Sequence, residues 1–214
     1  MKKLLTLAAL IFVTVAASAQ ITWSVKGGVG LASYSCDDVD MDNKIVARLG
    51  VGIEYPLTAN WSLMPSLELA LKGATFSESY EYSDLYNSYT ESWEEDFSVY
   101  YLQIPILAAY RLNLNDNWNM TIKAGPYFAY GLFGNGEYKE NSGQGWKENE
   151  NYDLFKEGVK RFDFGLDLGV DFEYHRYVFG LEYEMGLTNI MKNSDGKDGK
   201  VKNAAFFVTA GYKF

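Results

Sequence analysis

The chain has 214 residues, a net charge of -9, one cysteine and one histidine, and 16% of its residues are aromatic. One cysteine excludes a disulfide framework and a cysteine-based zinc cluster, and the acidic balance argues against nucleic-acid binding, which requires a basic surface. The length fits one domain, and the abundance of aromatic residues favours β structure.

Residues 1–19 have the features of a secretory signal peptide. Lys2 and Lys3 precede an apolar run from Leu4 to Val15, and Ala17-Ser18-Ala19 fits the cleavage motif. At about 1.5 Å per residue the apolar run is too short to cross a hydrocarbon core of ~30 Å. We therefore expect an exported protein whose barrel domain comprises residues 20–214.

Eight segments downstream alternate between apolar and polar residues with a period of two, which is typical of strands with two different faces. In the clearest of them, Phe162, Phe164 and Leu166 share one face, while Asp163 and Asp167 share the other. The predicted strands span residues 21–32, 44–55, 61–73, 98–112, 118–132, 161–174, 177–188 and 203–214.

The predicted connections alternate between short and long. The short ones are residues 56–60, 113–117 and 175–176, and the long ones are residues 33–43, 77–97, 133–160 and 189–202. Such a pattern predicts an all-β, eight-stranded antiparallel up-and-down barrel with one plain end and one elaborated end. Both chain termini are expected at the plain end.

Two eight-stranded barrels fit this pattern: a lipocalin-like barrel with an apolar interior and a transmembrane β-barrel of the outer-membrane type with a polar interior. Each predicted strand has one aromatic residue at its end nearest a short turn, and this residue lies on the apolar face of the strand. Tryptophan and tyrosine favour a membrane interface, because one end of the ring is apolar and the other is polar. We therefore predict the outer-membrane barrel, with an interface girdle formed by Trp23, Tyr55, Trp61, Tyr110, Trp118, Tyr174, Tyr177 and Phe214.

The polar faces of the same strands carry charges of both signs. In an outer-membrane barrel these faces line the lumen, and eight strands enclose a space just wide enough for side chains. We predict a packed lumen without a wide pore, held by a charge network of Lys26, Arg48, Glu54, Glu68, Lys72, Arg111, Lys123, Arg161, Asp163, Asp167, Asp171, Glu173, Glu182 and Glu184.

Five short segments, taken in order, give the chain a family resemblance. They are Tyr-Leu-Gln-Ile-Pro-Ile at 101–106, Ala-Gly-Pro-Tyr at 124–127, Arg-Phe-Asp-Phe-Gly-Leu at 161–166, Gly-Leu-Thr-Asn-Ile at 186–190 and Gly-Tyr-Lys-Phe at 211–214. With them the chain resembles the small outer-membrane β-barrel proteins of Bacteroidetes, the porin-family or PorT-like group. The resemblance implies the fold and the outer-membrane location, with Phe214 as the terminal aromatic residue of an insertion signal, and it implies no defined activity.

Few residues match a catalytic or metal-binding pattern. The single histidine, His175, falls in a predicted two-residue turn, so a turn residue is a better interpretation than a catalytic base. Residues 37–43 resemble part of a calcium loop, but the glycine at the sixth position is missing and Leu49 occupies the place of the bidentate glutamate. We expect no catalytic residue, no metal site and no cofactor.

Two of the predicted long loops combine acidic and aromatic residues. Aromatic residues in polar loops can bind a protein partner or a glycan, while the simpler alternative is a solvated rim of hairpins beyond the bilayer. The candidate binding residues are Tyr80, Tyr82, Tyr86, Trp93 and Trp146.

The sequence thus predicts a non-enzymatic outer-membrane barrel that contacts lipid, with periplasmic termini and extracellular long loops. Its predicted role is either structural, as an anchor, or the binding of an extracellular partner or glycan through those loops. Two alternatives stay open, a soluble lipocalin-like carrier of an apolar ligand and a narrow solute channel. A membrane-embedded enzyme is disfavoured, because His175 is expected at the periplasmic end.

Overall fold

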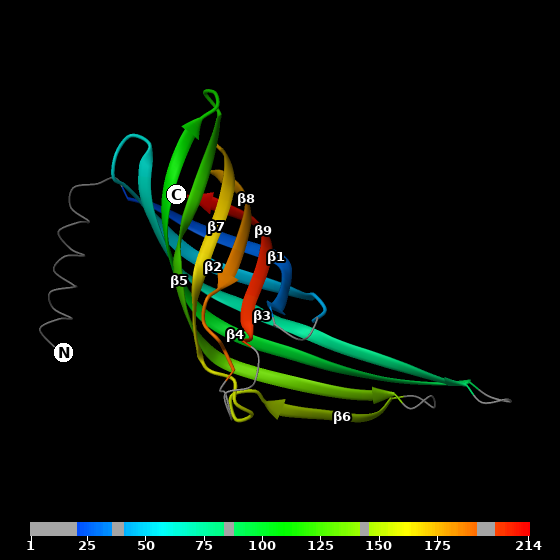
Figure 1. The fold of residues 1–214 in the computed structure, drawn as a ribbon. Helices are drawn as coiled ribbons and strands as arrows, with labels where there is room; N and C mark the ends of the chain where they lie inside the picture. The colour runs from blue at the N-terminus through cyan, green and yellow to red at the C-terminus, as the bar shows by residue number, and fades with distance from the viewer. Residues whose placement is uncertain (1–20, 36–40, 84–87, 142–145, 192–199) are drawn as a thin grey trace, which may run out of the picture.

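The computed structural model describes residues 21–35, 41–83, 88–141, 146–191 and 200–214, and Figure 1 shows their arrangement. In this part of the chain there are nine strands. They are β1 (Thr22–Ser35), β2 (Lys44–Pro56), β3 (Trp61–Ser83), β4 (Ser88–Asn113), β5 (Trp118–Asn141), β6 (Trp146–Asp153), β7 (Phe162–Tyr174), β8 (Tyr177–Gly186) and β9 (Lys202–Lys213).

Eight of these strands close into an antiparallel ring. Each pairs with its neighbours in the order β1-β2-β3-β4-β5-β7-β8-β9, and β1 pairs with β9 from Ser24↔Lys213 to Ser35↔Lys202. Closure pairs the backbone groups of every strand in the ring, which a bilayer requires because an unpaired group in hydrocarbon costs several kcal/mol. The predicted eight-stranded barrel is confirmed.

The barrel has one plain end and one elaborated end, as the alternation of connection lengths predicts. The connections from β2 to β3, from β4 to β5 and from β7 to β8 are short, and β1 begins and β9 ends at the same level. The backbone N–H of Phe214 donates to the carbonyl of Trp23 over 2.9 Å, which ties the two ends of the ring together.

The ninth strand and the length of three others were not predicted. Strands β3, β4 and β5 have 23, 26 and 24 residues, and β6 pairs with β5 beyond the ring. Figure 1 shows these four strands projecting from the barrel as a twisted sheet. We call this part, formed by residues 76–83, 88–98 and 134–141 together with β6, the projecting sheet.

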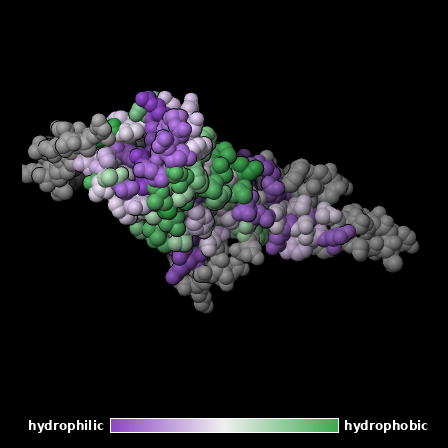
Figure 2. Space-filling model, turned by 90° about the horizontal axis from the view of Figure 1, so that it is seen from above, coloured by the Kyte–Doolittle hydropathy of each residue, from purple (hydrophilic) through white to green (hydrophobic). Residues whose placement is uncertain are grey.

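The two faces of the barrel wall have opposite character, and the apolar face points outward. Val29, Ile45 and Leu49 are 64%, 78% and 61% exposed, whereas Arg48 and Glu68 are buried. Figure 2 shows hydrophobic residues gathered in a band across the barrel, with hydrophilic residues on either side. An apolar surface this large needs lipid as its solvent. The lipocalin-like alternative, with an apolar interior, is therefore wrong for this chain.

Among the described residues, no helix is long and apolar enough to span a membrane.

Candidate functional site

The lumen is filled by ion pairs, and Arg48 on β2 lies at their centre. Its guanidinium donates to Glu184 Oε1 over 2.8 Å and to Glu182, both on β8. It also lies 3.6 Å from a carboxylate oxygen of Glu68 and 3.8 Å from one of Asp167. Strands β2, β3, β7 and β8 are thus joined across the interior through one cation.

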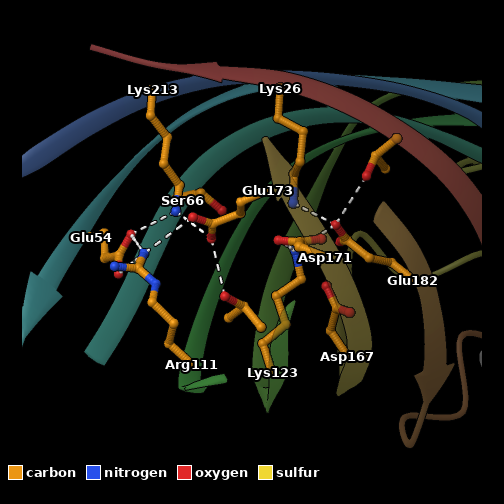
Figure 3. Close-up of polar contacts among 12 residues, drawn as sticks. Lys26, Glu54, Ser66, Arg111, Lys123, Asp167, Asp171, Glu173, Glu182 and Lys213 are labelled. Carbon is orange, nitrogen blue, oxygen red and sulfur yellow. Dashed lines mark hydrogen bonds and ion pairs between the residues drawn. The ribbon is translucent and has the colours of Figure 1, made fainter. Parts of the chain in front are cut away.

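Glu182 connects this centre to two lysines on other strands, as Figure 3 shows. Lys26 on β1 and Lys123 on β5 donate to Glu182 Oε1 over 2.6 and 2.8 Å. Lys123 also pairs with Asp171 on β7. The carboxylate of Glu182 therefore receives bonds from three basic side chains, which offsets the cost of burying it.

A second group of pairs lies nearer the short turns and is also drawn in Figure 3. Arg111 donates through Nη2 to both carboxylate oxygens of Glu54 over 2.7 and 2.9 Å, and hydrogen bonds between two charged groups are stronger than those between neutral groups. Lys213 lies 2.8 Å from Glu54 and 2.5 Å from Glu173, and Thr121 donates to Glu173 over 3.0 Å.

At the other side of the centre, charges meet an apolar layer. Lys72 on β3 lies 2.6 Å from Glu184, and its Nζ is 4.0 Å from the centroid of the Tyr127 ring. The Tyr127 hydroxyl donates to Asp163 over 3.0 Å. Beyond it, toward the long connections, the interior is filled mainly by buried apolar side chains, which include Val99, Tyr101, Ala129, Leu154, Phe155 and Phe207.

The charged part of the lumen leaves little free space. A cavity between β1, β2, β3 and β9 that reaches Lys123 and Asp171 has a volume of about 40 Å³. This volume holds a few water molecules at most, so the cavity is too small for a solute. The geometry matches a packed lumen.

The predicted charge network assembles with one exception, and it contains members that were missed. Arg161 is exposed and outside the lumen. It lies just before β7 begins, so the alternation of side chains along the strand does not include it. Its guanidinium donates to the carbonyls of Gly131 and Leu132 and lies 3.9 Å from the centroid of the Phe155 ring. The missed members include Gln103, Thr121, Asn203, Thr209 and Lys213. Lys213 lies on the polar face of its strand, so the alternation in the sequence could have placed it in the lumen.

The aromatic residues predicted as a girdle all lie near the ends of strands at the plain end. Six are exposed, and Tyr55 and Tyr110 are partly buried. Trp61 packs against Tyr110 with ring centroids 5.0 Å apart, and Trp118 against Tyr174 at 4.9 Å. Tyr212, which was not predicted, packs between Tyr177 and Phe214 at 5.5 and 5.3 Å.

The candidate loop residues fall on the projecting sheet or outside the described residues. Tyr80 is 52% exposed, and its hydroxyl donates to Glu78 over 2.7 Å. Trp93 is half-buried and packs against Phe76 at 5.1 Å. The side chains of Tyr82 and Trp146, and all of Tyr86, lie outside what the structure describes.

The two places where the sequence suggests a catalytic or metal-binding residue are the turn at His175 and the calcium-like segment at 37–43. His175 is exposed in the β7–β8 turn with φ 54°, in the left-handed region where histidine is enriched, and its ring packs against Tyr174. Within these ranges no group of three His, Cys, Asp or Glu side chains could hold a metal. Asp42 from the calcium-like segment accepts a hydrogen bond from Ser77, and residues 36–40 lie outside the described part.

The comparison with protein families decides which class of barrel this is. The model described as "Outer membrane protein beta-barrel domain" matches residues 16–192. This chain belongs to that family. It is therefore an outer-membrane β-barrel, and the apolar outer face with its polar interior agrees with the family. Membership of the narrower Bacteroidetes, PorT-like group is a finer prediction that the match leaves open.

Solved structures share this fold at low sequence identity. Ail, the attachment invasion locus protein of Yersinia pestis, is 16% identical, with 90% of this chain and 98% of that chain covered and a TM-score of 0.41. The structure of Ail in complex with the heparin analogue sucrose octasulfate is 17% identical, with 91% of this chain and 99% of that chain covered and a TM-score of 0.39. Neisserial surface protein A is 13% identical, with 89% of this chain and 95% of that chain covered and a TM-score of 0.44. No curated protein matches the sequence.

Proposed function

We propose that this protein is a non-enzymatic outer-membrane anchor that displays the projecting sheet outside the cell and uses it to bind a basic protein partner. The observation that carries the proposal is the contrast between the two halves of the molecule. The barrel is closed and filled, whereas β3, β4, β5 and β6 continue far beyond it as an acidic sheet.

The orientation follows from the two ends of the barrel. The plain end of the barrel has the short turns, and the short turns of outer-membrane barrels face the periplasm, so we place this end there. Long connections of outer-membrane barrels face the outside, which places the projecting sheet on the cell surface. The charged lumen anchors this arrangement, because its ion pairs join every strand of the ring.

The charge of the projecting sheet favours a basic partner. Its two basic residues are Lys139 and Lys147. Its acidic residues are far more numerous: Glu78, Glu81, Glu91, Glu94, Glu95, Asp96, Glu137, Glu140, Glu148, Glu150 and Asp153. Such a surface attracts cationic groups and accelerates their association. The ligand of the Ail complex, sucrose octasulfate, is a polyanion, and a glycan of that kind would be repelled here.

The edges of the sheet provide backbone groups for a partner. In the described part of the chain, β6 pairs with β5 alone, and β3 beyond Phe76 pairs with β4 alone. Both outer strands thus leave backbone N–H and C=O groups that an extended segment can pair with. Tyr80 adds an exposed ring on β3, and tyrosine is enriched at protein interfaces.

A shortened sheet tests this proposal. Replacing residues 79–92 by Asn-Gly joins Glu78 to Trp93, which face each other across the β3–β4 pair, through a two-residue hairpin turn. With the full-length protein in phosphatidylcholine nanodiscs, we expect a lysine-rich extended peptide to bind, and the shortened variant to bind it at least about tenfold more weakly. Fluorescence anisotropy of the labelled peptide measures both affinities.

Tyr80→Ala refines the test, with Tyr177→Ala as its matched control. The two side chains are 52% and 55% exposed, but they lie at opposite ends of the barrel. We expect only Tyr80→Ala to weaken peptide binding. Equal affinities for the full and shortened sheets, in variants that keep the heat-dependent electrophoretic shift of a folded barrel, would contradict the proposed function.

A further inference from the structure

A cavity of about 530 Å³ lies at the elaborated end, above the apolar layer of the lumen. Its walls come from distant parts of the chain: Tyr34 at the end of β1, Phe97 on β4, Tyr152 on β6, and Val159 and Ile190 in the connections after β6 and β8. Sites for small molecules usually have volumes of about 300–1,000 Å³ and mostly apolar walls.

Hydrogen bonds hold the walls of this cavity in place. The segment after β6 turns back on itself, with the N–H of Phe155 donating to the Asp153 side chain and that of Val159 to the carbonyl of Leu154, each over 3.0 Å. The N–H of Lys160 then donates to the carbonyl of Ile190 over 2.6 Å. These bonds fix two connections against each other, so the cavity is a built feature of the fold.

A glycine makes room for one wall. Gly136 on β5 faces Tyr152 on β6, and a Cβ atom at this position would lie 2.2 Å from the Tyr152 ring. Only glycine therefore lets this ring lie flat over β5. The Tyr152 hydroxyl donates to Glu95 on β4, which fixes the ring at the rim of the cavity.

The charged groups of the cavity are all negative. Glu95, Glu150 and Glu157 line it, and the described residues that form its wall contain no lysine or arginine. Burial and the hydrogen bond to Glu95 raise the pKa of the Tyr152 phenol, so that this hydroxyl stays a donor at neutral pH. The rings of Tyr34, Phe97 and Tyr152 also line the cavity, and the face of an aromatic ring attracts a cation.

We propose that this cavity binds a small organic cation, an amine or quaternary ammonium with an apolar body. The apolar walls would take the body, while the three glutamates and the aromatic rings would hold the positive group. An anion of the same shape would meet uncompensated carboxylates. β6 contributes Glu150 and Tyr152 to this cavity and an edge to the projecting sheet, but the cavity takes its ligand through side chains and the edge through backbone groups. The proposal therefore does not depend on the proposed function.

The test uses a pair of probes with the same body and opposite charge, 4-tert-butylbenzylammonium and 4-tert-butylbenzoate. The full-length protein is placed in phosphatidylcholine nanodiscs, because detergent could fill the cavity, and empty nanodiscs correct for partition into lipid. Isothermal titration calorimetry should show saturable binding of the ammonium probe and at least about tenfold weaker binding of the carboxylate.

Two variants locate the binding. Glu157→Gln removes one charge from the rim, and Met191→Trp places a large side chain at a partly exposed position of the wall. We expect Glu157→Gln to lower the affinity for the ammonium probe severalfold and Met191→Trp to abolish its binding. Glu78→Gln, on the projecting sheet and outside the wall of this cavity, is the control and should leave the affinity unchanged.

Three results would overturn the proposal: no saturable binding of the ammonium probe, equal affinity for the two probes, or unchanged affinity in Met191→Trp. The heat-dependent electrophoretic shift shows whether each variant is folded. Should Met191→Trp fail to fold, Glu157→Gln and the comparison of the two probes decide the question alone. The shortened sheet retains Glu95, Glu150 and Glu157, so its peptide binding and the binding of the ammonium probe can fail separately.

Discussion

At the residue scale, the lumen shows why the polar face of the strands carries charges of both signs. Arg48 lies among Glu68, Asp167, Glu182 and Glu184, so its removal would leave several carboxylates facing one another. Breaking a buried ion pair by removing one partner costs about 3–5 kcal/mol, since the remaining charge is uncompensated. Stability in the lumen therefore depends on the balance of charges more than on any single pair.

Arg48→Met should lower the free energy of unfolding by about 3–5 kcal/mol. The matched control is Arg176→Met, which changes an exposed arginine in the β7–β8 turn and should have little effect. Urea unfolding in lipid vesicles, followed by tryptophan fluorescence, measures both. Equal losses in the two variants would mean that the charge network does not stabilise the barrel.

Residues also show where strand parity succeeds and where it fails. In β7, Asp163, Asp167 and Asp171 were assigned to the interior because they alternate with exposed apolar residues, and the structure buries all three. Arg161 was assigned by the same parity, but it lies before the first paired residue of the strand. Parity gives the direction of a side chain only where the backbone is in the pleated conformation.

At the element scale, the eight strands of the ring could be predicted and the projecting sheet could not. Strands of the ring separate lipid from a polar interior, which forces strict alternation along the chain. Beyond the barrel both faces of β3, β4 and β5 leave the lipid, so alternation is no longer required. The same argument covers β6, whose sequence WKENENYD has no apolar period.

The apolar layer of the lumen could not be predicted from the sequence for a related reason. At Val99-Tyr100-Tyr101-Leu102 on β4, inward and outward residues are both apolar, and alternation in hydropathy disappears although alternation in direction continues. The cavity above this layer draws its walls from five separate segments, and no local pattern marks it. Such sites follow from tertiary packing and need a structure to be found.

Gly125→Ala should disrupt the pairing of β4 with β5. The ladder is interrupted between Pro105↔Tyr127 and Ala108↔Ala124, and a Cβ atom at Gly125 would lie 2.1 Å from the carbonyl oxygen of Ile106. We expect a loss of about 1–3 kcal/mol in unfolding free energy, because the backbone of β4 must shift.

The control for this prediction is Gly27→Ala on β1, where the nearest atom to a new Cβ would be 3.6 Å away, an ordinary contact. Urea titration of the electrophoretic shift compares both variants with the unchanged protein. A Gly125→Ala barrel as stable as the Gly27→Ala barrel would show that β4 can move aside without cost.

At the scale of the whole molecule, the structure consists of a barrel with a filled lumen and an extended surface at its elaborated end. The lumen joins the strands of the ring through charges, and its cavity of about 40 Å³ has no room for a solute. The elaborated end carries the acidic projecting sheet and the larger cavity. Binding is therefore expected at that end.

A filled lumen predicts that the protein does not conduct. In planar bilayers, the purified protein should give no steady unitary currents under conditions in which a known open porin does. The expectation follows from the ion pairs that cross the interior between β2 and β8 and between β5 and β8. Reproducible unitary steps, absent from preparations of denatured protein, would favour the solute-channel alternative.

We propose that the barrel exposes the projecting sheet outside the cell and the short turns in the periplasm. In a Cys36→Ser background, the variants Ser79→Cys and Asn115→Cys place one thiol at each end of the barrel. A membrane-impermeant maleimide added to intact cells should label Ser79→Cys alone, with Asn115→Cys labelled only after the outer membrane is disrupted. Labelling of Asn115→Cys alone in intact cells, or recovery of the protein in the soluble fraction, would contradict the account.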